Sequence, residues 1–168
     1  SAASDVYKRQ VMPWFAGDAI WRVNVRRWVG SGSAARPWRA GDRGDKCGLA
    51  RGGANALYEA DRLRPGRAAI IVEGELDAIT INQEAGDLIA AVATGAVTWA
   101  RRARWVGRLA IADIVLVTFD ADDAGEGARA YWLDVLPNAK AWRPYYGDAN
   151  AMLQSGADLR AWIQAGID

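Results

Sequence analysis

The sequence predicts an α/β protein built on a parallel sheet with helices on both faces. Two observations carry this prediction. Short apolar runs without polar alternation, typical of strands buried on both faces, alternate with segments that repeat apolar residues at helical spacing. Two of these runs lead straight into acidic residues, at the end of the strand where such sheets place their sites. With 168 residues, 51% of them hydrophobic, the chain can bury a core.

Four apolar runs are expected to form the parallel sheet, with helices between and after them. The expected strands cover residues 68–72, 88–93, 115–119 and 139–144. The side chains expected to face inward from the four helices are Leu76, Ile79 and Ala85; Trp99, Ala103 and Val106; Ala124, Ala128, Tyr131, Trp132 and Val135; and Leu159, Trp162 and Ile163. Arg101, Arg104 and Arg108 share the outer side of the second helix, and such a stripe is more often solvated than bound to nucleic acid.

A basic α+β segment is expected before the sheet, over residues 11–67. Residues 1–67 hold 13 Lys and Arg against 6 Asp and Glu, whereas residues 68–168 hold 8 against 14. Residues 19–29 alternate as a half-buried antiparallel strand does. Its apolar side is expected to carry Trp21, Val23, Val25 and Val29, and its other side Arg22, Asn24, Arg26 and Trp28. Residues 1–10 resemble a translated transposon end from a sequencing library and are excluded from the fold.

Basic residues interspersed with tryptophan follow this strand, from Gly30 to Gly53, in a stretch whose Gly, Ser and Pro content is typical of an irregular loop. Such a segment can contact phosphates and stack bases. Equally, its cations can serve only to solvate a loop. The residues expected to bind nucleic acid are Arg22, Arg26, Arg36, Arg39, Arg43 and Lys46.

The cysteine and histidine content excludes several kinds of site. Cys47 is the single cysteine and the chain has no histidine, which rules out disulfides, Cys/His zinc sites and an imidazole base within this chain. No apolar stretch approaches the roughly 18 residues of a membrane span, and no signal peptide begins the sequence. A cytoplasmic protein without a membrane partner is therefore expected.

Acidic residues follow three separate strands of the expected sheet. Glu73 comes after the first, Asp120 and Asp122 after the third, and Asp148 after the fourth. Because the carboxyl ends of parallel strands share one edge, these acids are expected to converge on Mg²⁺ or Mn²⁺, which prefer oxygen ligands. The alternative is that Asp120, Asp122 or Asp123 caps the helix that begins near Ala124, and one of the three is expected to do so.

The same residues resemble the three signatures of the Toprim domain, which occurs in DnaG-type primases, topoisomerases, nucleases and repair proteins. The signatures are Glu73-Gly74-x-x-Asp77, Asp120-x-Asp122-x-Ala124-Gly125 and Asp148-Ala149-Asn150. They are most similar to those of primases from phages and mobile elements, including primase-helicases. The resemblance implies a Rossmann-like fold over residues 68–168, catalytic roles for Glu73, Asp120 and Asp122, and Asp148 as a further metal ligand. It implies supporting roles for Gly74, Asp77, Gly95, Gly125 and Asn150.

The function that the resemblance implies is a Mg²⁺-dependent nucleotidyltransferase, the core of a DNA primase. Its partners would be a single-stranded DNA template, nucleoside triphosphates and a replicative helicase, fused or separate. Two departures stand out: Gly147 replaces a lysine common in primases, and Glu75 replaces an aromatic residue. Since the same metal centre with water as nucleophile would cut DNA, a Toprim nuclease stays an alternative. A phosphatase of the haloacid-dehalogenase kind and a non-catalytic nucleic-acid-binding module are the others.

Overall fold

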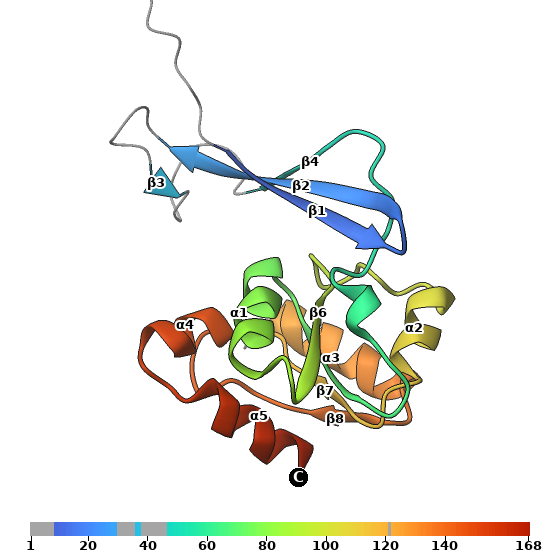
Figure 1. The fold of residues 1–168 in the computed structure, drawn as a ribbon, viewed down its shortest axis with the longest axis vertical. Helices are drawn as coiled ribbons and strands as arrows, with labels where there is room; N and C mark the ends of the chain where they lie inside the picture. Colours follow the sequence, from blue (N-terminus) through green and yellow to red (C-terminus); the bar gives the residue numbers. More distant parts are fainter. Residues whose placement is uncertain (1–8, 30–35, 38–46, 121) are drawn as a thin grey trace, which may run out of the picture. The chain divides into compact units, whose positions relative to one another are not determined.

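The computed structural model describes residues 9–29, 36–37, 47–120 and 122–168. The chain forms two compact units, Ser1–Ala54 and Asn55–Asp168 (Figure 1). The two units divide after Ala54, whereas the charge distribution suggested a division after residue 67. The reason is that residues 55–67 join the second unit: the main chain of Tyr58 pairs with that of Ala93, and Trp105 Nε1 donates to the Asn55 carbonyl over 3.2 Å.

The second unit contains the expected parallel sheet. Its strands are β5 (Ala68–Val72), β6 (Ile89–Ala93), β7 (Val115–Val117) and β8 (Ala139–Ala141), in the spatial order β6-β5-β7-β8. All three neighbouring pairs are parallel. Every residue of β5, β6 and β7 is buried, which explains why these strands read as continuous apolar runs. The α/β prediction is confirmed.

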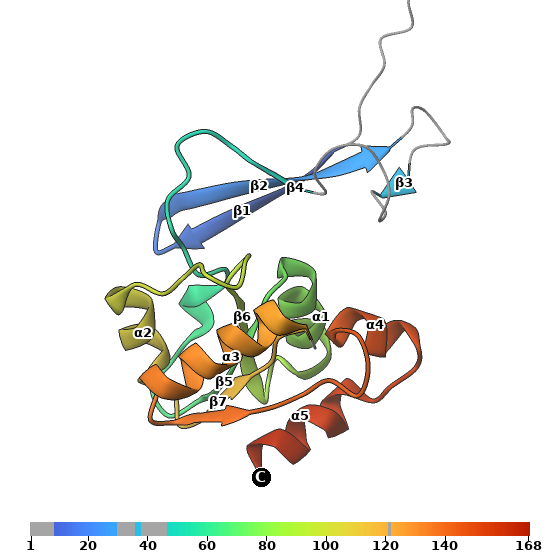
Figure 2. The ribbon, with the colours of Figure 1, turned by 180° about the vertical axis from the view of Figure 1, so that it is seen from behind.

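Helices cover both faces of this sheet. The helices are α1 (Glu75–Ala85), α2 (Ala103–Leu109), α3 (Asp123–Val135), α4 (Ala149–Gln154) and α5 (Leu159–Ile167), with a 3₁₀ turn at Ala60–Arg62. Helix α1 lies in front of the sheet in Figure 1, and α3 lies in front in Figure 2, seen from behind. On the α1 side, α4 and α5 complete a core centred on Ile70, Leu116 and Trp162.

Two of the helices turn a different side to the sheet than the sequence predicted. Helix α1 buries Ala85 as expected, but with it Ala78 and Ile81, whereas the expected Leu76 and Ile79 are half-buried. Helix α2 buries Trp105 and Leu109, while the expected Trp99, Ala103 and Val106 are not fully buried. Periodicity identifies rows of apolar side chains, but the loops at each end of a helix decide which row meets the sheet. In α3, Ala128 and Trp132 are buried as expected and Ala124 is exposed; in α5 all three predicted residues are buried.

The arginine stripe on α2 contacts the protein itself. Arg101 donates to the Val97 carbonyl over 2.8 Å and lies above the Tyr131 ring, and Arg108 pairs with Asp61 at 3.2 Å. The sequence favoured a solvated face, whereas these two arginines are engaged with other parts of the protein. Among the described residues, no helix is long and apolar enough to cross a membrane.

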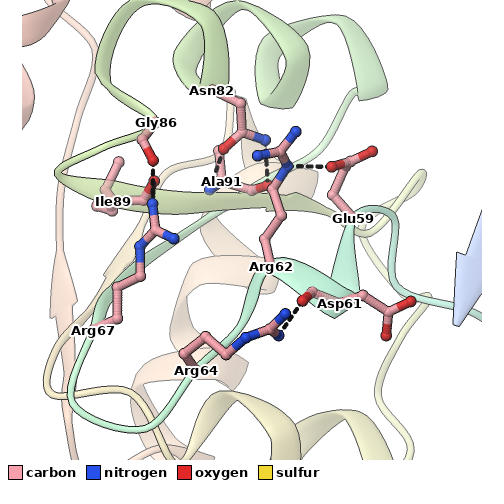
Figure 3. A network of polar contacts seen from close by, with 9 residues as sticks. All are labelled: Glu59, Asp61, Arg62, Arg64, Arg67, Asn82, Gly86, Ile89 and Ala91. Carbon is pink, nitrogen blue, oxygen red and sulfur yellow. Dashed lines mark hydrogen bonds and ion pairs between the residues drawn. The ribbon is translucent and has the colours of Figure 1, made fainter. Parts of the chain in front are cut away.

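Polar side chains brace the edge strand β6 (Figure 3). Asn82 on α1 makes two hydrogen bonds with the main chain of Ala91, at 2.9 and 3.0 Å. Arg67 donates to the carbonyls of Gly86 and Ile89, the second over 3.3 Å. Main-chain groups on an edge strand would otherwise be open to pairing with another chain, so these contacts protect the sheet. Beside them, Glu59–Arg62 and Arg64–Asp61 contacts hold the segment that enters the unit.

The first unit is a small antiparallel sheet. Its strands are β1 (Arg9–Ala16), β2 (Ala19–Val29), β3 (Arg36–Pro37) and β4 (Cys47–Leu49), with β1, β3 and β4 each antiparallel to β2. Gly17 at φ 62° provides the left-handed conformation of the β1–β2 turn. Strand β1 begins at Arg9, inside the segment excluded from the sequence-based fold, because main-chain pairing requires no particular side chain.

The alternation along β2 is confirmed, but the buried side is the polar one. Arg22 and Asn24 are 8% and 4% exposed, whereas Trp21, Val23 and Val25 are half-buried. Arg22 Nε donates to Asn24 Oδ1 over 2.7 Å, and its guanidinium lies 4.7 Å from the centre of the Trp14 ring. Hydrogen bonding and stacking on an aromatic face allow a guanidinium to be buried, so the more polar side need not face water.

Candidate functional site

Four acidic side chains line one hollow at the carboxyl end of the parallel sheet. The chain leaves β5 for β6 on one side and then returns to β7 on the other, so the order of strands reverses between β5 and β7. Open α/β sheets bind their ligands at such a switch point. The hollow lies there and is lined by Val72, Glu73, Asp77, Thr118, Phe119, Asp120, Pro144, Asp148 and Ala149.

Glu73 is placed by the turn that follows β6. The Gly95 amide donates to the Glu73 carbonyl over 2.8 Å, and the Thr94 amide donates to the Val72 carbonyl over 3.1 Å. Gly95 has φ 75°, a conformation that glycine adopts without strain. Gly95 therefore holds the main chain of Glu73 beside the end of β6.

Asp120 is placed by β7 and by close packing of the first turn of α3. The Thr118 amide continues the ladder to the Ile71 carbonyl at 2.9 Å. A Cβ atom at Gly125 would lie 2.1 Å from the Asp120 carbonyl oxygen and 3.2 Å from its amide nitrogen. Only glycine fits at that distance from another main chain. Gly125 thus sets the path of the main chain that carries Asp120.

Asp77 and Asp148 link α1 to α4 at the wall of the hollow. The Asn150 amide donates to Asp77 Oδ1 over 3.1 Å, and the Asn150 side chain lies 3.5 Å from the Thr80 hydroxyl. Asp148 caps α4, accepting from the Ala151 amide at 2.7 Å. A Cβ atom at Gly74 would lie 2.9 Å from Asp77 Oδ2, so the glycine leaves room for this carboxyl group. Gly74 and Asn150, both predicted from the sequence as supporting residues, thus adjoin the Asp77 carboxyl group.

Burial, together with the negative charges of Asp148 and Asp120, raises the pKa of Asp77 to about 7. A hydrogen bond with the Asp148 carboxylate acts in the same direction, while the Asn150 amide opposes it. The Asp77 carboxyl group therefore keeps its proton to a higher pH than an ordinary aspartate does. A carboxyl group in this state marks a site where negative charge is crowded.

Asp122 caps helix α3, as one acid of its group was expected to do. Its Oδ1 accepts a hydrogen bond from the Gly125 amide at 2.7 Å, and the residue is exposed. Asp122 is not among the residues that line the hollow, although the sequence suggested that it and Asp120 would point at one spot. The cap fixes its side chain toward the helix because a free amide at a helix start is a strong donor.

A buried arginine on α3 is a polar residue of this region that the sequence did not predict. Arg129 is 3% exposed and donates to the Phe119 carbonyl, directly before Asp120, over 2.9 Å. It also pairs with Glu126, which in turn pairs with Arg143 at 2.7 Å. Hydrogen bonds from these two arginines, first from Arg129, lower the pKa of Glu126. The signal available in the sequence was an arginine three residues before the buried Trp132, on the inward side of the helix.

The donor chemistry of the hollow fits a hard divalent cation. Its four acids offer carboxylate oxygens, and none of the described residues in its wall is Lys or Arg. Burial is the largest cause of the raised pKa of Asp77, and the negative charges of Asp148 and Asp120 add to it. As their side chains lie, the described residues form no group of three or more acidic, cysteine or histidine ligands around one point. Carboxylates that repel one another in this way are the usual ligands of Mg²⁺ and Mn²⁺.

The residues expected to bind nucleic acid lie in the first unit and differ in exposure. Arg26 and Arg36 are half-buried, and Arg22 is buried against Trp14. Arg39, Arg43 and Lys46 lie outside the described residues. Arg22 therefore has little surface with which to contact a phosphate, while Arg26 and Arg36 keep part of theirs.

Comparisons with known proteins agree with this architecture. The profile of a family described as Toprim-like matches residues 70–153. No curated protein sequence matches the chain. Among solved structures, the primase fragment of the bacteriophage T7 primase-helicase is similar with a TM-score of 0.66 at 18% identity, over 95% of this chain and 63% of that one.

Two bacterial structures show the same likeness. A DNA primase domain from Pseudomonas aeruginosa has a TM-score of 0.65 at 24% identity, over 93% of this chain and 50% of its own. The RNA polymerase domain of Mycobacterium tuberculosis primase DnaG has a TM-score of 0.64 at 16% identity, over 94% and 55%. At these identities the similarity establishes a shared fold. The chain spans between half and two thirds of the length of these three structures.

Proposed function

The chain belongs to the Toprim-like family, and from this premise we propose that it is the catalytic core of a DNA primase, which joins nucleoside triphosphates into a short RNA primer on single-stranded DNA. One observation carries the proposal. Glu73, Asp120 and Asp148, which follow three different strands, line one hollow together with Asp77. The primase folds matched over more than 90% of this chain support the same assignment.

In this proposal, Glu73, Asp120 and Asp148 hold Mg²⁺ or Mn²⁺ through their carboxylate oxygens. Asp122, whose Oδ1 is used by the cap, would have to direct its second oxygen to the hollow to serve as a further ligand. Divalent cations at such a site promote loss of the proton from an attacking hydroxyl and neutralise the departing pyrophosphate. No imidazole base is then needed, in keeping with a chain that has no histidine.

The protein's own part is to place these oxygens and to manage protons. Arg129 and Gly125 set the main chain on either side of Asp120. Glu73 would accept a proton from the hydroxyl that attacks, because it lies at the same rim and is only half-buried. Asp77 fixes the start of α4 through the Asn150 amide and so holds Asp148 against the hollow.

In the same proposal, the basic residues of the first unit bind the single-stranded DNA template. Residues 1–67 carry the excess of positive charge noted above, and Arg26 and Arg36 keep exposed surface. Cationic side chains that neutralise phosphates provide binding that depends little on sequence and strongly on salt. A replicative helicase, fused to the chain or separate, would supply the single-stranded template.

An assay with labelled nucleoside triphosphates, single-stranded DNA and Mg²⁺ tests the proposal. A primase yields labelled products that grow with time and disappear when Mg²⁺ is chelated. Asp120→Asn should abolish them, whereas Asp123→Asn, the same change at an exposed acid of the same turn, should not. Shortening of the DNA without labelled products would instead identify a nuclease, since the same carboxylates can direct water onto a phosphodiester.

A further inference from the structure

Two exposed aromatic side chains lie in the segment that joins β8 to α4. Tyr145 is 66% exposed and Tyr146 is 46% exposed, more than any other large hydrophobic residue described in the second unit. Ile111 at 42% and Leu133 at 38% come next. Single exposed apolar residues are ordinary on a protein surface. Two adjacent aromatic rings are less so, and their position gives them a use.

The tyrosine pair, Tyr145 and Tyr146, lies at the rim of the acidic hollow. Pro144 before the pair and Asp148 after it are both part of the wall. Each tyrosine is therefore no more than two residues from the wall, a main-chain distance of at most about 7 Å. The length of a tyrosine side chain is comparable to this distance, so either ring can reach a ligand that extends from the hollow.

The segment that carries the pair is held at both ends. On the β8 side, the Trp142 amide donates to the Val117 carbonyl over 3.1 Å, and the Thr118 hydroxyl donates to the Trp142 carbonyl over 3.0 Å. Trp162 Nε1 donates to the Arg143 carbonyl over 3.1 Å, and the Arg143 side chain pairs with Glu126 on α3.

On the α4 side, Asp148 is fixed by its cap, and Gly147 makes the turn with φ 57°. A Cβ atom at Gly147 would lie 3.1 Å from the Ala151 Cβ, so the turn also packs closely on the helix. The two tyrosines are thus presented from a braced loop. Ordering this loop in advance lowers the entropy that a ligand would have to remove.

The chemistry of the rim complements that of the hollow. Carboxylates offer a nucleobase no stacking surface and repel phosphates until cations are bound. Aromatic rings stack on any base, which adds affinity without charge and without sequence preference. Tyrosine is suited to this role because its ring is large and loses little rotamer freedom when it binds.

We propose that the tyrosine pair forms a platform that binds a nucleobase at the edge of the active site. The base belongs either to the nucleotide being added or to the template strand, which present the same stacking surface. This inference rests on the proposed function for its ligand class, and it assigns the pair a role in binding and not in proton or phosphate chemistry.

The test compares oligothymidylate with an abasic strand of equal length, both fluorescently labelled, by anisotropy in chelator. The abasic strand has the same phosphates but nothing to stack. If the pair stacks a template base, Tyr145→Ala and Tyr146→Ala should each weaken binding of oligothymidylate about 5- to 100-fold and leave the abasic strand unaffected. The corresponding Phe variants should bind as the wild type does. Leu133→Ala, at another exposed apolar residue, is the matched control.

A second measurement, filter binding of labelled ATP with Mg²⁺, separates the two sources of the base. If the Ala variants bind ATP more weakly but oligothymidylate as the wild type does, the pair stacks the base of the incoming nucleotide. If they bind oligothymidylate more weakly, the pair stacks a template base. The proposal would be overturned if the Ala variants bound ATP and oligothymidylate as tightly as the wild type does. It would also be overturned if they lost as much affinity for the abasic strand as for oligothymidylate. If the protein bound oligothymidylate more tightly than the abasic strand but synthesised no primer, the role of the tyrosine pair would be supported and the proposed primase function contradicted.

Discussion

The main-chain amide of Asn150 donates a hydrogen bond to the Asp77 carboxyl group over 3.1 Å, joining the first turns of α4 and α1. This contact brings an acid from a helix to a site whose other acids follow strands. It also places Asp77 beside Asp148, and their mutual repulsion is one cause of the raised pKa of Asp77. The hydrogen bond therefore connects the architecture of the site with its protonation.

Stability without metal should fall as pH rises from about 4 to about 7. The pKa of Asp77 is about 7 in the folded chain against 3.8 for an ordinary aspartate, so the folded state binds a proton that the unfolded state has lost across this range. The free energy of unfolding then decreases by at most about 1.4 kcal/mol per pH unit. Thermal melts in chelator at pH 5 and pH 8 should show the lower melting temperature at pH 8.

Asp77→Asn should flatten this dependence, because the amide keeps an acceptor for Asn150 and no longer titrates. Asp87→Asn is the control. Hydrogen bonds from Arg160 lower the pKa of Asp87 to about 2, so the stability that this exposed acid contributes is lost only as pH falls through that value. An unchanged slope between pH 5 and pH 8 in Asp77→Asn would show that another group causes the effect.

Removing one acid of the hollow should stabilise the metal-free protein and abolish its response to Mg²⁺. Asp120→Asn relieves repulsion among the acids, so its melting temperature in chelator should equal or exceed that of the wild type. Mg²⁺ at ten times its Kd should stabilise the wild type by about 1.4 kcal/mol and Asp120→Asn much less. Melts with and without Mg²⁺ measure both effects. If Mg²⁺ raised the melting temperature of Asp120→Asn as much as that of the wild type, Asp120 would not be a metal ligand.

The two roles assigned to Asp122 can be separated by two substitutions. Asn accepts the hydrogen bond from the Gly125 amide as Asp does, whereas Ala cannot. Asp122→Ala should lower the free energy of unfolding by about 0.5–2 kcal/mol with or without Mg²⁺. Asp122→Asn should keep the metal-free stability and weaken the Mg²⁺ response. If Asn behaves as wild type in both conditions, Asp122 is a helix cap and nothing more.

Gly125 and Gly127 form a matched pair within α3. A Cβ atom at Gly125 would collide with the Asp120 carbonyl, whereas one at Gly127 has no atom within 4 Å. Gly125→Ala should therefore cost about 1–3 kcal/mol and displace Asp120, with loss of the Mg²⁺ response and of primer synthesis. Gly127→Ala should stabilise the helix by about 0.5–1 kcal/mol and leave both unchanged. Urea unfolding and the primer assay compare the two variants directly.

The basic residues of the first unit should determine how DNA binding depends on salt. Replacing Arg36, Arg39, Arg43 and Lys46 with Ala should reduce the slope of log affinity against log salt by about 0.7 for each phosphate of single-stranded DNA that the variant no longer neutralises. Arg160→Ala, which removes a cation paired with Asp87, is the control and should leave the slope unchanged. An unaltered slope in the fourfold variant would mean that these side chains only solvate their segment.

The sequence predicted the strands of the parallel sheet closely, because each is an apolar run with no competing pattern. Residues 68–72 form β5 as expected, and β6 and β7 begin within one residue of the expected positions. The alternation of β2 was also correct. The side of β2 that is buried was not predictable, since a charged residue such as Arg22 becomes compatible with burial only through Trp14 and Asn24.

By itself, the sequence determined the fold class and the meeting of Glu73, Asp120 and Asp148, because acids that directly follow parallel strands share one edge of the sheet. Tertiary structure alone decided the rest of the site. Asp77 and Arg129 lie on helices, and their approach to the hollow depends on how α1 and α3 are rotated against the sheet. Asp122 turned to cap α3 because a helix amide was within reach, a contact that spacing allowed but that only the folded main chain could select.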